Sequence, residues 1–221
     1  MQIYFIRHGE PNYEKDCLTE TGKKQAMAVA NCLKDLGIEK VFSSTNGRAL
    51  ETASYTAKFL GLDVVPCDFM REIDWSSIDA KPHSINVSPW DNADILASKG
   101  ISLSKGAWQE IEPFNRSKLV DSVAKTVDCF DELLSTFGYK REGEHYRVTK
   151  KEEVKSIAIF SHGGSSSAVL SHLTNVSFIH FCGNFQLHFT SISVISLAND
   201  VGSLVCPKVE VLNDHKHIFG I

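Results

Sequence analysis

The chain opens with an apolar run that stops abruptly at polar residues, and this feature limits its possible folds more than any other. Residues 3–6 are all apolar and are followed by Arg7, His8 and Gly9. Such a run predicts a strand buried on both faces, as at the centre of a parallel sheet. Parallel sheets bind ligands beyond the carboxyl ends of their strands. A fixed cation and a titratable ring at that position suit a phosphate group.

Two further strand ends repeat this pattern. The apolar residues 156–160 end in Ser161, His162 and two glycines, and a helix of small residues is expected to follow. Residues 41–44 predict another short strand, which leads into a helix with Arg48 in its first turn. A cation weakens the start of a helix slightly, but it strengthens the anion site that the unpaired backbone N–H groups create there. The polar residues at these strand ends therefore indicate an anion-binding site.

Four motifs stand in a fixed order along the first 171 residues. They are Arg7-His8-Gly9-Glu10, residues 18–26 (LTETGKKQA), residues 43–53 (SSTNGRALETA) and His162-Gly163-Gly164. In order and spacing they resemble the histidine phosphatase superfamily, the phosphoglycerate mutase-like proteins. A fifth segment, residues 70–75, is similar to the segment that carries the proton donor in that family. The resemblance implies an α/β fold and a phosphoryl-transfer activity.

The chemistry of a phosphate ester assigns a role to each of these side chains. Arg7, Arg48 and His162 would neutralise the phosphoryl oxygens that repel a nucleophile. Neutral His8 would attack phosphorus and form a phosphohistidine, with its other ring nitrogen bonded to a backbone carbonyl. Glu72 would protonate the leaving alcohol, since nearby phosphate raises the pKa of a carboxyl group. Asp74, on the same side of an extended chain, is the competing choice of acid.

Two departures from the family pattern affect the pocket. Many relatives have an asparagine where this chain has Glu14, so Asn12 is the candidate phosphate ligand in this loop. Gly163 is expected to present its N–H to the phosphate as well as to permit a tight turn. The glycine and tryptophan cluster that normally follows the acid is replaced by residues 76–80. The entrance to the pocket is therefore expected to differ from that of relatives.

Composition narrows the class of partner. The net charge is −4 and the pI is about 6.1, and no run of basic residues suits a nucleic acid or an anionic membrane. The expected partner is a small phosphorylated substrate, and a cytoplasmic location is expected because no signal peptide or long apolar run is present. The six cysteines lack metal-binding spacing, so most are expected to be buried, and no metal or cofactor is predicted.

The remaining pattern predicts one domain over residues 1–221, with a mostly parallel sheet flanked by helices on both faces. Thr19 is expected to cap a helix that ends at Gly37 and buries Leu33 and Leu36. A second helix is expected to stop at Gly61.

Residues 73–113 break the alternation of strands and helices. Their prolines, glycines and three tryptophans predict an inserted cap that helps to choose the substrate. A long helix is expected over residues 116–137, and a solvated connection over 139–154. Residues 191–211 predict an antiparallel hairpin at the sheet edge.

The sequence leaves alternatives open for the pocket residues and for the function. Arg141 and His145 are minor candidates for the pocket, and His215 and His217 are expected to lie in an exposed tail. A phosphomutase would need further cations for a second acid group, and only Arg71 and Lys81, Lys99 and Lys105 lie near the cap. A non-catalytic module that binds a phosphorylated ligand is the rival from another class. The sequence favours a phosphomonoester hydrolase.

Overall fold

The main sheet has the predicted, mostly parallel arrangement. The structure is a computed structural model that describes residues 1–78 and 87–221. Within these residues the main sheet contains strands in the order β11-β9-β1-β8-β4-β5, and β1, β8, β4 and β5 run parallel. The strands are β1 Gln2–Arg7, β4 Lys40–Ser43, β5 Val64–Pro66, β8 Ser156–Ser161, β9 Ile192–Ser196 and β11 Lys208–Asp214. The predicted fold class is confirmed.

Strand β1 is buried on both faces, as its apolar run predicts. Ile3 and Phe5 contribute to one apolar cluster. Tyr4 and Ile6 contribute to another on the opposite face. Because side chains alternate along a strand, these four consecutive residues seal both layers of the core against the centre of the sheet.

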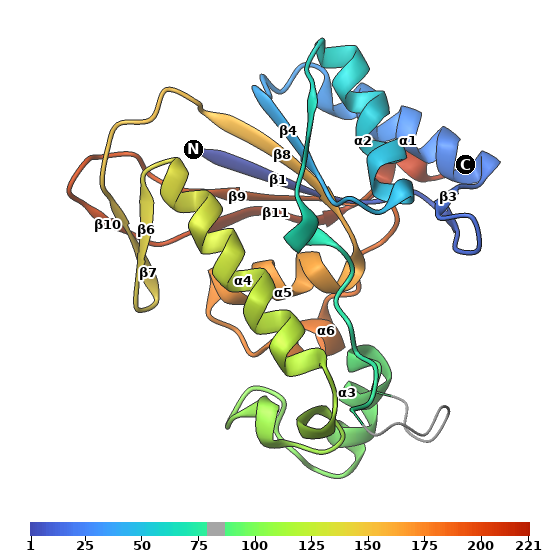
Figure 1. Ribbon diagram of the computed structural model, residues 1–221, viewed down its shortest axis with the longest axis vertical. Coiled ribbons are helices and arrows are strands. Elements are labelled where there is room, and N and C mark those ends of the chain that lie inside the picture. Colours follow the sequence, from blue (N-terminus) through green and yellow to red (C-terminus); the bar gives the residue numbers. More distant parts are fainter. Residues whose placement is uncertain (79–86) are drawn as a thin grey trace.

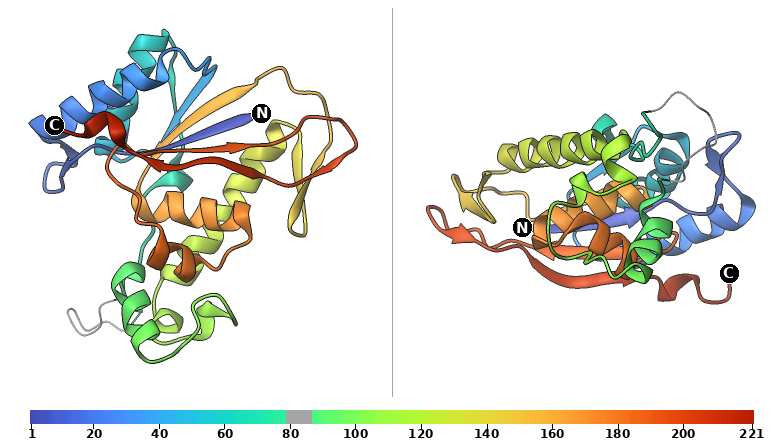
Figure 2. Two further views of the ribbon diagram at one scale, coloured as in Figure 1. Left: turned by 180° about the vertical axis from the view of Figure 1, so that it is seen from behind. Right: turned by 90° about the horizontal axis from the view of Figure 1, so that it is seen from below.

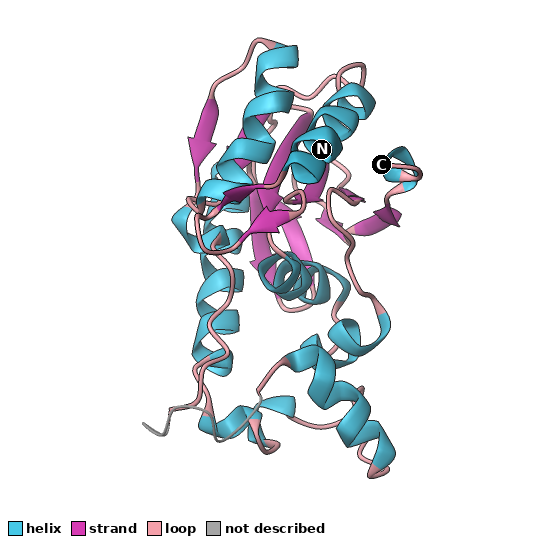
Figure 3. Cartoon of the chain, turned by 90° about the vertical axis from the view of Figure 1, so that its right-hand side faces the viewer, coloured by secondary structure: helices cyan, strands magenta, loops and turns pink. Residues whose placement is uncertain are grey.

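Helices cover both faces of the sheet (Figure 1). Helices α1, Glu20–Leu33, and α2, Gly47–Leu60, pack side by side on one face. Helices α4, Leu119–Thr136, and α5, Gly163–Thr174, cover the other face, followed by the short α6, Phe178–Asn184. Figure 3 shows the sheet between these two layers of helices.

The ends of α1 and α2 are set by local residues, with one departure from prediction. The side chain of Thr19 accepts a hydrogen bond from the Gly22 N–H, so the predicted cap of α1 is present. Gly61 ends α2 in the left-handed conformation, as expected. The prediction that α1 buries Leu36 on its way to Gly37 is wrong, because the helix ends at Leu33 and Leu36 is 43% exposed.

Residues 87–118 lie at the N-terminal end of α4, below the sheet in Figure 1. They contain α3, Pro89–Ser98, and two 3₁₀ turns, Trp108–Glu110 and Phe114–Arg116. Their apolar side chains share one cluster with α4, α5 and α6. Residues 79–86 lie outside the described part of the chain, and the division into a domain with a cap stays a prediction. Helix α4 begins at Leu119, later than expected.

Residues 139–154 do not form the expected solvated connection. Strands β6, Tyr139–Glu142, and β7, His145–Val148, make a hairpin that joins β10, Leu204–Val205, in a second sheet. Tyr146 is fully buried, and its hydroxyl donates a hydrogen bond to Asp131 at 2.5 Å. The second sheet projects to one side of the main sheet in both views of Figure 2.

The C-terminal part of the chain returns to the main sheet. β9 pairs antiparallel with both β1 and β11, so the predicted edge hairpin is present, although residues 204–205 leave it for the second sheet. The final residues are not a free tail, because Nε2 of His217 lies 3.0 Å from the Thr190 hydroxyl. A small pair of strands, β2 Pro11–Asn12 and β3 Cys17–Leu18, follows β1.

Only Cys67 and Cys182 are buried, so the expectation that most cysteines are buried is wrong. Across residues 1–78 and 87–221, no helix is both long and apolar enough to cross a bilayer.

Leu33 and Leu36 provide a test of how α1 packs. Leu33 is fully buried, so we expect Leu33→Ala to lower the free energy of unfolding by about 2–5 kcal/mol. The exposed Leu36 is the matched control, and Leu36→Ala should change it by no more than about 0.5 kcal/mol. Urea unfolding followed by circular dichroism measures both. Equal losses in the two variants would show that α1 extends through Leu36.

Candidate active site

Three neighbouring parallel strands end at the same place and bring the site together. His8 follows β1, His162 follows β8 and Ser44 follows β4. Backbone bonds continue past the strand ends, since the His8 N–H donates to Ser161 at 2.9 Å and the Ser44 N–H donates to Phe160 at 2.8 Å. The carboxyl ends of adjacent parallel strands share one edge of the sheet. Residues separated by more than 100 positions therefore meet there.

His8 is held in one orientation by its own loop. Its Nδ1 lies 2.7 Å from the carbonyl oxygen of Gly9, the kind of backbone contact that the sequence predicts. Because a carbonyl only accepts, Nδ1 carries the proton and Nε2 keeps its lone pair. Arg48 Nε donates to this Nε2 at 3.3 Å. The rings of His8 and His162 have centroids 5.1 Å apart.

Both imidazole rings are buried beside positive charge and stay neutral. Burial lowers the pKa of His8 to about 3, with Arg7 and Arg48 adding to the effect, while the bond to Gly9 opposes it. Burial also lowers the pKa of His162 to about 2, assisted by His8 and the two arginines. A neutral ring with a free Nε2 lone pair is the form of histidine that acts as a nucleophile.

Arg48 is aimed by a residue that the sequence did not single out. Asp16 accepts from the Arg48 guanidinium at 2.5 Å and from the Gly47 N–H at 2.7 Å. Its carboxylate therefore caps α2, whose own cap residue Asn46 makes no side-chain cap bond. Asp16 has a positive φ of 47° in the loop after β2, and no regular spacing reveals a carboxylate there.

Arg7 lies beside the start of α5, where a Cβ on Gly163 would be 3.7 Å from its guanidinium carbon. Its Nη1 donates to the Leu187 carbonyl at 2.5 Å, and its guanidinium lies 4.3 Å from the centre of the Phe189 ring. Phe189 also contacts His8, with centroids 5.7 Å apart. This aromatic partner comes from a loop with no recognisable motif, so sequence reasoning missed it.

Two buried nitrogen atoms at this site lack a partner among the described residues. They are Nε of Arg7 and Nδ1 of His162, whose Nε2 lies 2.8 Å from the Ser44 hydroxyl. A buried polar group without a partner costs about 1–3 kcal/mol. An anion with several acceptor oxygens, placed between Arg7 and His162, satisfies both. The arrangement is therefore that of an anion-binding site.

Glu72 faces the same region from the segment after β5. Its Oε1 accepts from the N–H of Ser165 at 3.1 Å and of Ile73 at 3.0 Å, which fixes the carboxyl group at the start of α5. Burial raises the pKa of Glu72, although the two backbone bonds and Arg7 oppose the shift. A carboxyl group whose pKa is raised in this way suits the role of a proton donor.

The structure also places Asp74, Asn12 and Arg141, the other residues that the sequence suggests for the site. Asp74 is exposed, bonded to Ser76 and 3.4 Å from Lys118, and these contacts lower its pKa. The Asn12 side chain accepts from the Lys15 N–H at 3.1 Å, and its role as a phosphate ligand stays a prediction. Arg141 bonds to Asn175 and does not line the cavity of the site.

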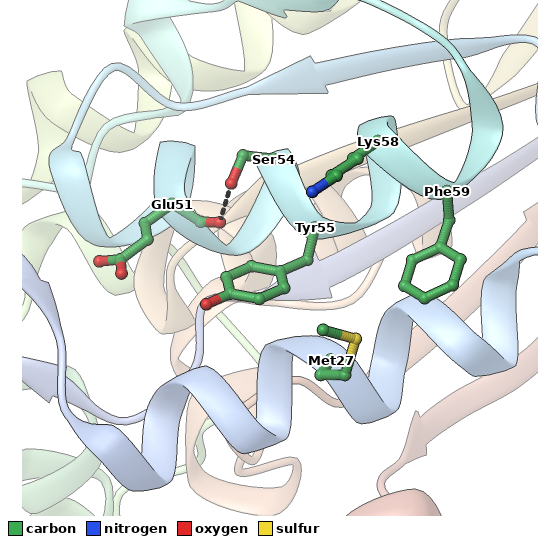
Figure 4. Close-up of a pocket in the computed structure, with 6 residues that line it drawn as sticks. All are labelled: Met27, Glu51, Ser54, Tyr55, Lys58 and Phe59. Atoms are coloured by element: carbon green, nitrogen blue, oxygen red, sulfur yellow. Dashed lines mark hydrogen bonds between the residues drawn. The ribbon is translucent and has the colours of Figure 1, made fainter.

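A cavity of about 310 Å³ opens beside this cluster. The described residues that line it are Arg7, Tyr13, Glu72, Trp75, Ser88, Trp90, Asp91, Gly163, Gln186 and Leu187. A larger hollow of about 680 Å³ lies between α1 and α2 (Figure 4). Its lining includes none of the buried polar atoms without a partner in the described part of the chain. Volume alone therefore does not identify the site.

The described residues contain no group of three or more His, Cys, Asp or Glu side chains placed to hold a metal ion. Positive charge at the site comes from the guanidinium groups of Arg7 and Arg48.

Comparison with known proteins agrees with the motifs. Residues 3–99 match the family model of the histidine phosphatase superfamily (branch 1). A probable phosphoglycerate mutase GpmB from Cronobacter sakazakii is 34% identical over 90 residues, and the match covers 37% of this chain and 42% of that relative. The match thus spans less than half the length of this curated relative. The family resemblance inferred from the motifs is confirmed.

Solved structures share the fold over nearly the whole chain. A mycobacterial glucosyl-3-phosphoglycerate phosphatase in complex with VO3 is 21% identical, with a TM-score of 0.63 and coverage of 96% of this chain and 98% of that one. The phosphoserine phosphatase of Entamoeba histolytica in complex with 3-phosphoglyceric acid is 22% identical, with a TM-score of 0.64 and coverage of 98% of both chains. At these identities the likeness shows the fold.

The neutral histidines make stability depend on pH. An unfolded histidine binds a proton below about pH 6.5, whereas folded His8 and His162 do so only near pH 3 and 2. Stability is therefore full above pH 6.5 and is lost as the pH falls. At pH 5 each neutral ring should lower the free energy of unfolding by about 2 kcal/mol. The free energy of unfolding of His162→Asn should therefore fall by about 2 kcal/mol less than that of wild type when the pH is lowered from 7 to 5.

Urea unfolding in phosphate-free buffer measures this difference. Leu36→Ala, which removes no titratable group from an exposed position, is the control and should lose as much as wild type. An unchanged loss in His162→Asn would mean that the folded ring takes up its proton near its usual pH.

Proposed function

We propose that this chain, which resembles the histidine phosphatase superfamily in sequence and fold, is a metal-independent phosphomonoester hydrolase that forms a phosphohistidine on His8. The family match supports an enzyme of phosphatase or mutase type. The observation that carries the proposal is the state of His8. Its ring is neutral, its Nδ1 is tied to Gly9, and its Nε2 lone pair lies beside Arg48 and His162.

In the first step the Nε2 lone pair of His8 attacks phosphorus. The P–N bond forms as the bond to the ester oxygen breaks, and its electron pair stays on the leaving oxygen. That oxygen takes a proton from the Glu72 carboxyl group. Arg7, Arg48 and His162 hold the phosphoryl oxygens, which would engage the Nε of Arg7 and the Nδ1 of His162 that have no other described partner.

In the second step water replaces the alcohol. The Glu72 carboxylate removes a proton from the water as its oxygen attacks phosphorus. The P–N bond breaks and its electron pair returns to His8, so inorganic phosphate is released and Glu72 is again protonated. Dividing one displacement in this way replaces a single difficult step with two easier ones.

Glu72 is the better acid for these steps on geometric grounds. It lines the cavity with Arg7, and burial raises the pKa of its carboxyl group. Asp74 is exposed and its pKa is lowered by Ser76 and Lys118, so it is ionised at neutral pH. Glu72 is therefore the proposed proton donor, and Asp74 is a surface residue that contacts α4.

A phosphomutase is the second candidate because the curated relative in the comparison is a probable mutase. Such an enzyme must hold a second acid group of its substrate. Of the described residues that line the cavity, Arg7 is the only cation. Arg71 is exposed and lies 3.8 Å from Asp68, and Lys81 falls outside the described residues. Hydrolysis is favoured, and a non-catalytic module would have no use for a fixed neutral His8.

Removing the nucleophile should abolish turnover without unfolding the protein. We expect His8→Ala to lower phosphate release from phosphomonoesters by at least about 10⁴-fold, because no phosphohistidine can form. The measurement is phosphate release in the presence of a metal chelator, with circular dichroism to confirm the fold. Undiminished turnover in His8→Ala would contradict the proposal. Loss of wild-type activity in the chelator would contradict metal independence.

Changing the acid should affect esters according to their leaving group. With Glu72→Gln we expect a loss of about 10²–10⁴-fold for alkyl phosphates, which need a proton on the alkoxide. 4-Nitrophenyl phosphate has a good leaving group, so it should still give a burst of one nitrophenol per enzyme while phosphohistidine accumulates. Stopped-flow absorbance and acid-quenched phosphoenzyme measure this. Asp74→Asn is the matched control and should resemble wild type. A burst in that variant instead would transfer the acid role to Asp74.

A further inference from the structure

The cavity that Arg7 lines contains two chemically different groups of side chains. Arg7, Glu72 and Gly163 belong to the anion site described above and are called its phosphate end. The other wall includes Trp75 and Trp90, whose rings form an edge-to-face pair with centroids 5.6 Å apart and an angle of 88°. Tyr13 also lines the cavity and is 67% exposed. An aromatic wall this close to an anion site has no part in the phosphoryl chemistry proposed above.

The aromatic wall reaches the phosphate end directly. A Cβ placed on Gly163 would lie 3.6 Å from Cζ2 of Trp90 and 3.7 Å from the guanidinium carbon of Arg7. The indole of Trp90 and the charged group of Arg7 therefore approach one another over the start of α5. A group attached to the phosphate through a short chain would rest on the Trp90 ring.

Both tryptophans are positioned by packing. Each is partly buried and packs against the apolar cluster that contains residues of α3, α4, α5 and α6. Ser88 caps α3 by accepting from the Asp91 N–H at 3.4 Å, which fixes the first turn where Trp90 lies. A rigid aromatic ring binds a flat ligand with little loss of conformational entropy, because it has only two side-chain torsions.

The charges at the cavity disfavour a second acid group on the alcohol. Among the described lining residues the single cation is Arg7, which the phosphate would engage, and Glu72 and Asp91 add two carboxyl groups. A carboxylate on the alcohol would lose water and lie near the Glu72 and Asp91 carboxyl groups, with no second cation among the described lining residues to offset that cost. An uncharged ring would instead bury apolar surface against Trp75 and Trp90.

We propose that Trp75, Trp90 and Tyr13 form a subsite for the alcohol part of the substrate, which selects phosphomonoesters that carry an uncharged aromatic ring on a short chain. This inference rests on the phosphomonoesterase function proposed above and names its substrate class. The ring stacks on or meets the edge of the Trp90 indole while the phosphate lies between Arg7 and His162.

The test compares esters that differ in the ring and share the chemistry of the leaving group. Both 2-phenylethyl phosphate and ethyl phosphate release a primary alcohol, so the ratio of their kcat/KM values reports on the subsite. We expect wild type to prefer the phenylethyl ester by about tenfold or more, as is typical for a few buried carbons. 3-Phosphoglycerate, with its carboxylate, should be the poorest of the three esters.

Variants connect the preference with the wall. Trp90→Ala should bring the ratio close to one while ethyl phosphate is still hydrolysed, which also shows that the fold is retained. Trp90→Phe keeps a ring and should keep most of the preference. Trp108→Phe is the matched control, because Trp108 lies in the same inserted segment but packs against Phe114 and Phe178 instead of the cavity. A ratio that is unchanged in Trp90→Ala would overturn the subsite.

Binding separates this inference from the proposed catalysis. Calorimetry on His8→Ala, which cannot form phosphohistidine, gives dissociation constants for the same three esters. Tighter binding of the phenylethyl ester than of ethyl phosphate supports the subsite even if wild type hydrolyses neither, in which case only the proposed function fails. Equal affinities, or tightest binding of 3-phosphoglycerate, would overturn the subsite even if the enzyme hydrolyses every ester.

Discussion

The site depends on one constraint, the burial of two uncharged imidazole rings between arginines. His8 and His162 remain neutral because burial and neighbouring cations lower their pKa values. That environment is possible only because β1 and β8 are adjacent and parallel, so that their ends meet. The loop after β1 must also lie directly on α1. A Cβ on Gly9 would be 2.6 Å from the Gly22 carbonyl, and one on Gly22 would be 2.1 Å from that of Glu10. Two glycines from separate motifs thus allow a single close contact.

The parts of this arrangement that are visible in the sequence are those determined by short-range patterns. A continuous apolar run that ends in a polar residue marks a central strand and its carboxyl end, so His8 and His162 were predicted along with the sheet. Arg48 was found because a cation in the first turn of a helix conflicts with the helix dipole and therefore points to an anion. Each inference needed only the residues beside it. The resemblance to a family then supplied Glu72, which no local pattern distinguishes from Asp74.

The parts that were missed depend on contacts between distant segments. Asp16 caps α2 from another loop, and Phe189 reaches Arg7 from the far end of the chain. The many charged residues of 139–154 predict a solvated connection, whereas the structure has the β6–β7 hairpin there. The alternation of buried Tyr146 and Val148 with partly exposed neighbours was a signal for β7 that the sequence did contain. Leu36 continues the helical period of α1, but the helix stops before it, and periodicity cannot show where a chain turns.

The proposed catalytic residues lie mainly at strand ends, whereas the proposed aromatic subsite draws its two tryptophans from the segment after Glu72. The phosphate end is built from backbone that the sheet holds in place. The aromatic wall comes from residues 75 and 90, on either side of the undescribed residues 79–86, in the stretch with the least regular pattern. Trp90 and Arg7 both lie beside Gly163 at the start of α5, 3.6 and 3.7 Å from the position of a Cβ there. On the proposed function, a change in the wall would alter which alcohol is accepted while the neutral histidines and their arginines keep their positions. In this arrangement the substrate class is the property that sequence motifs describe least.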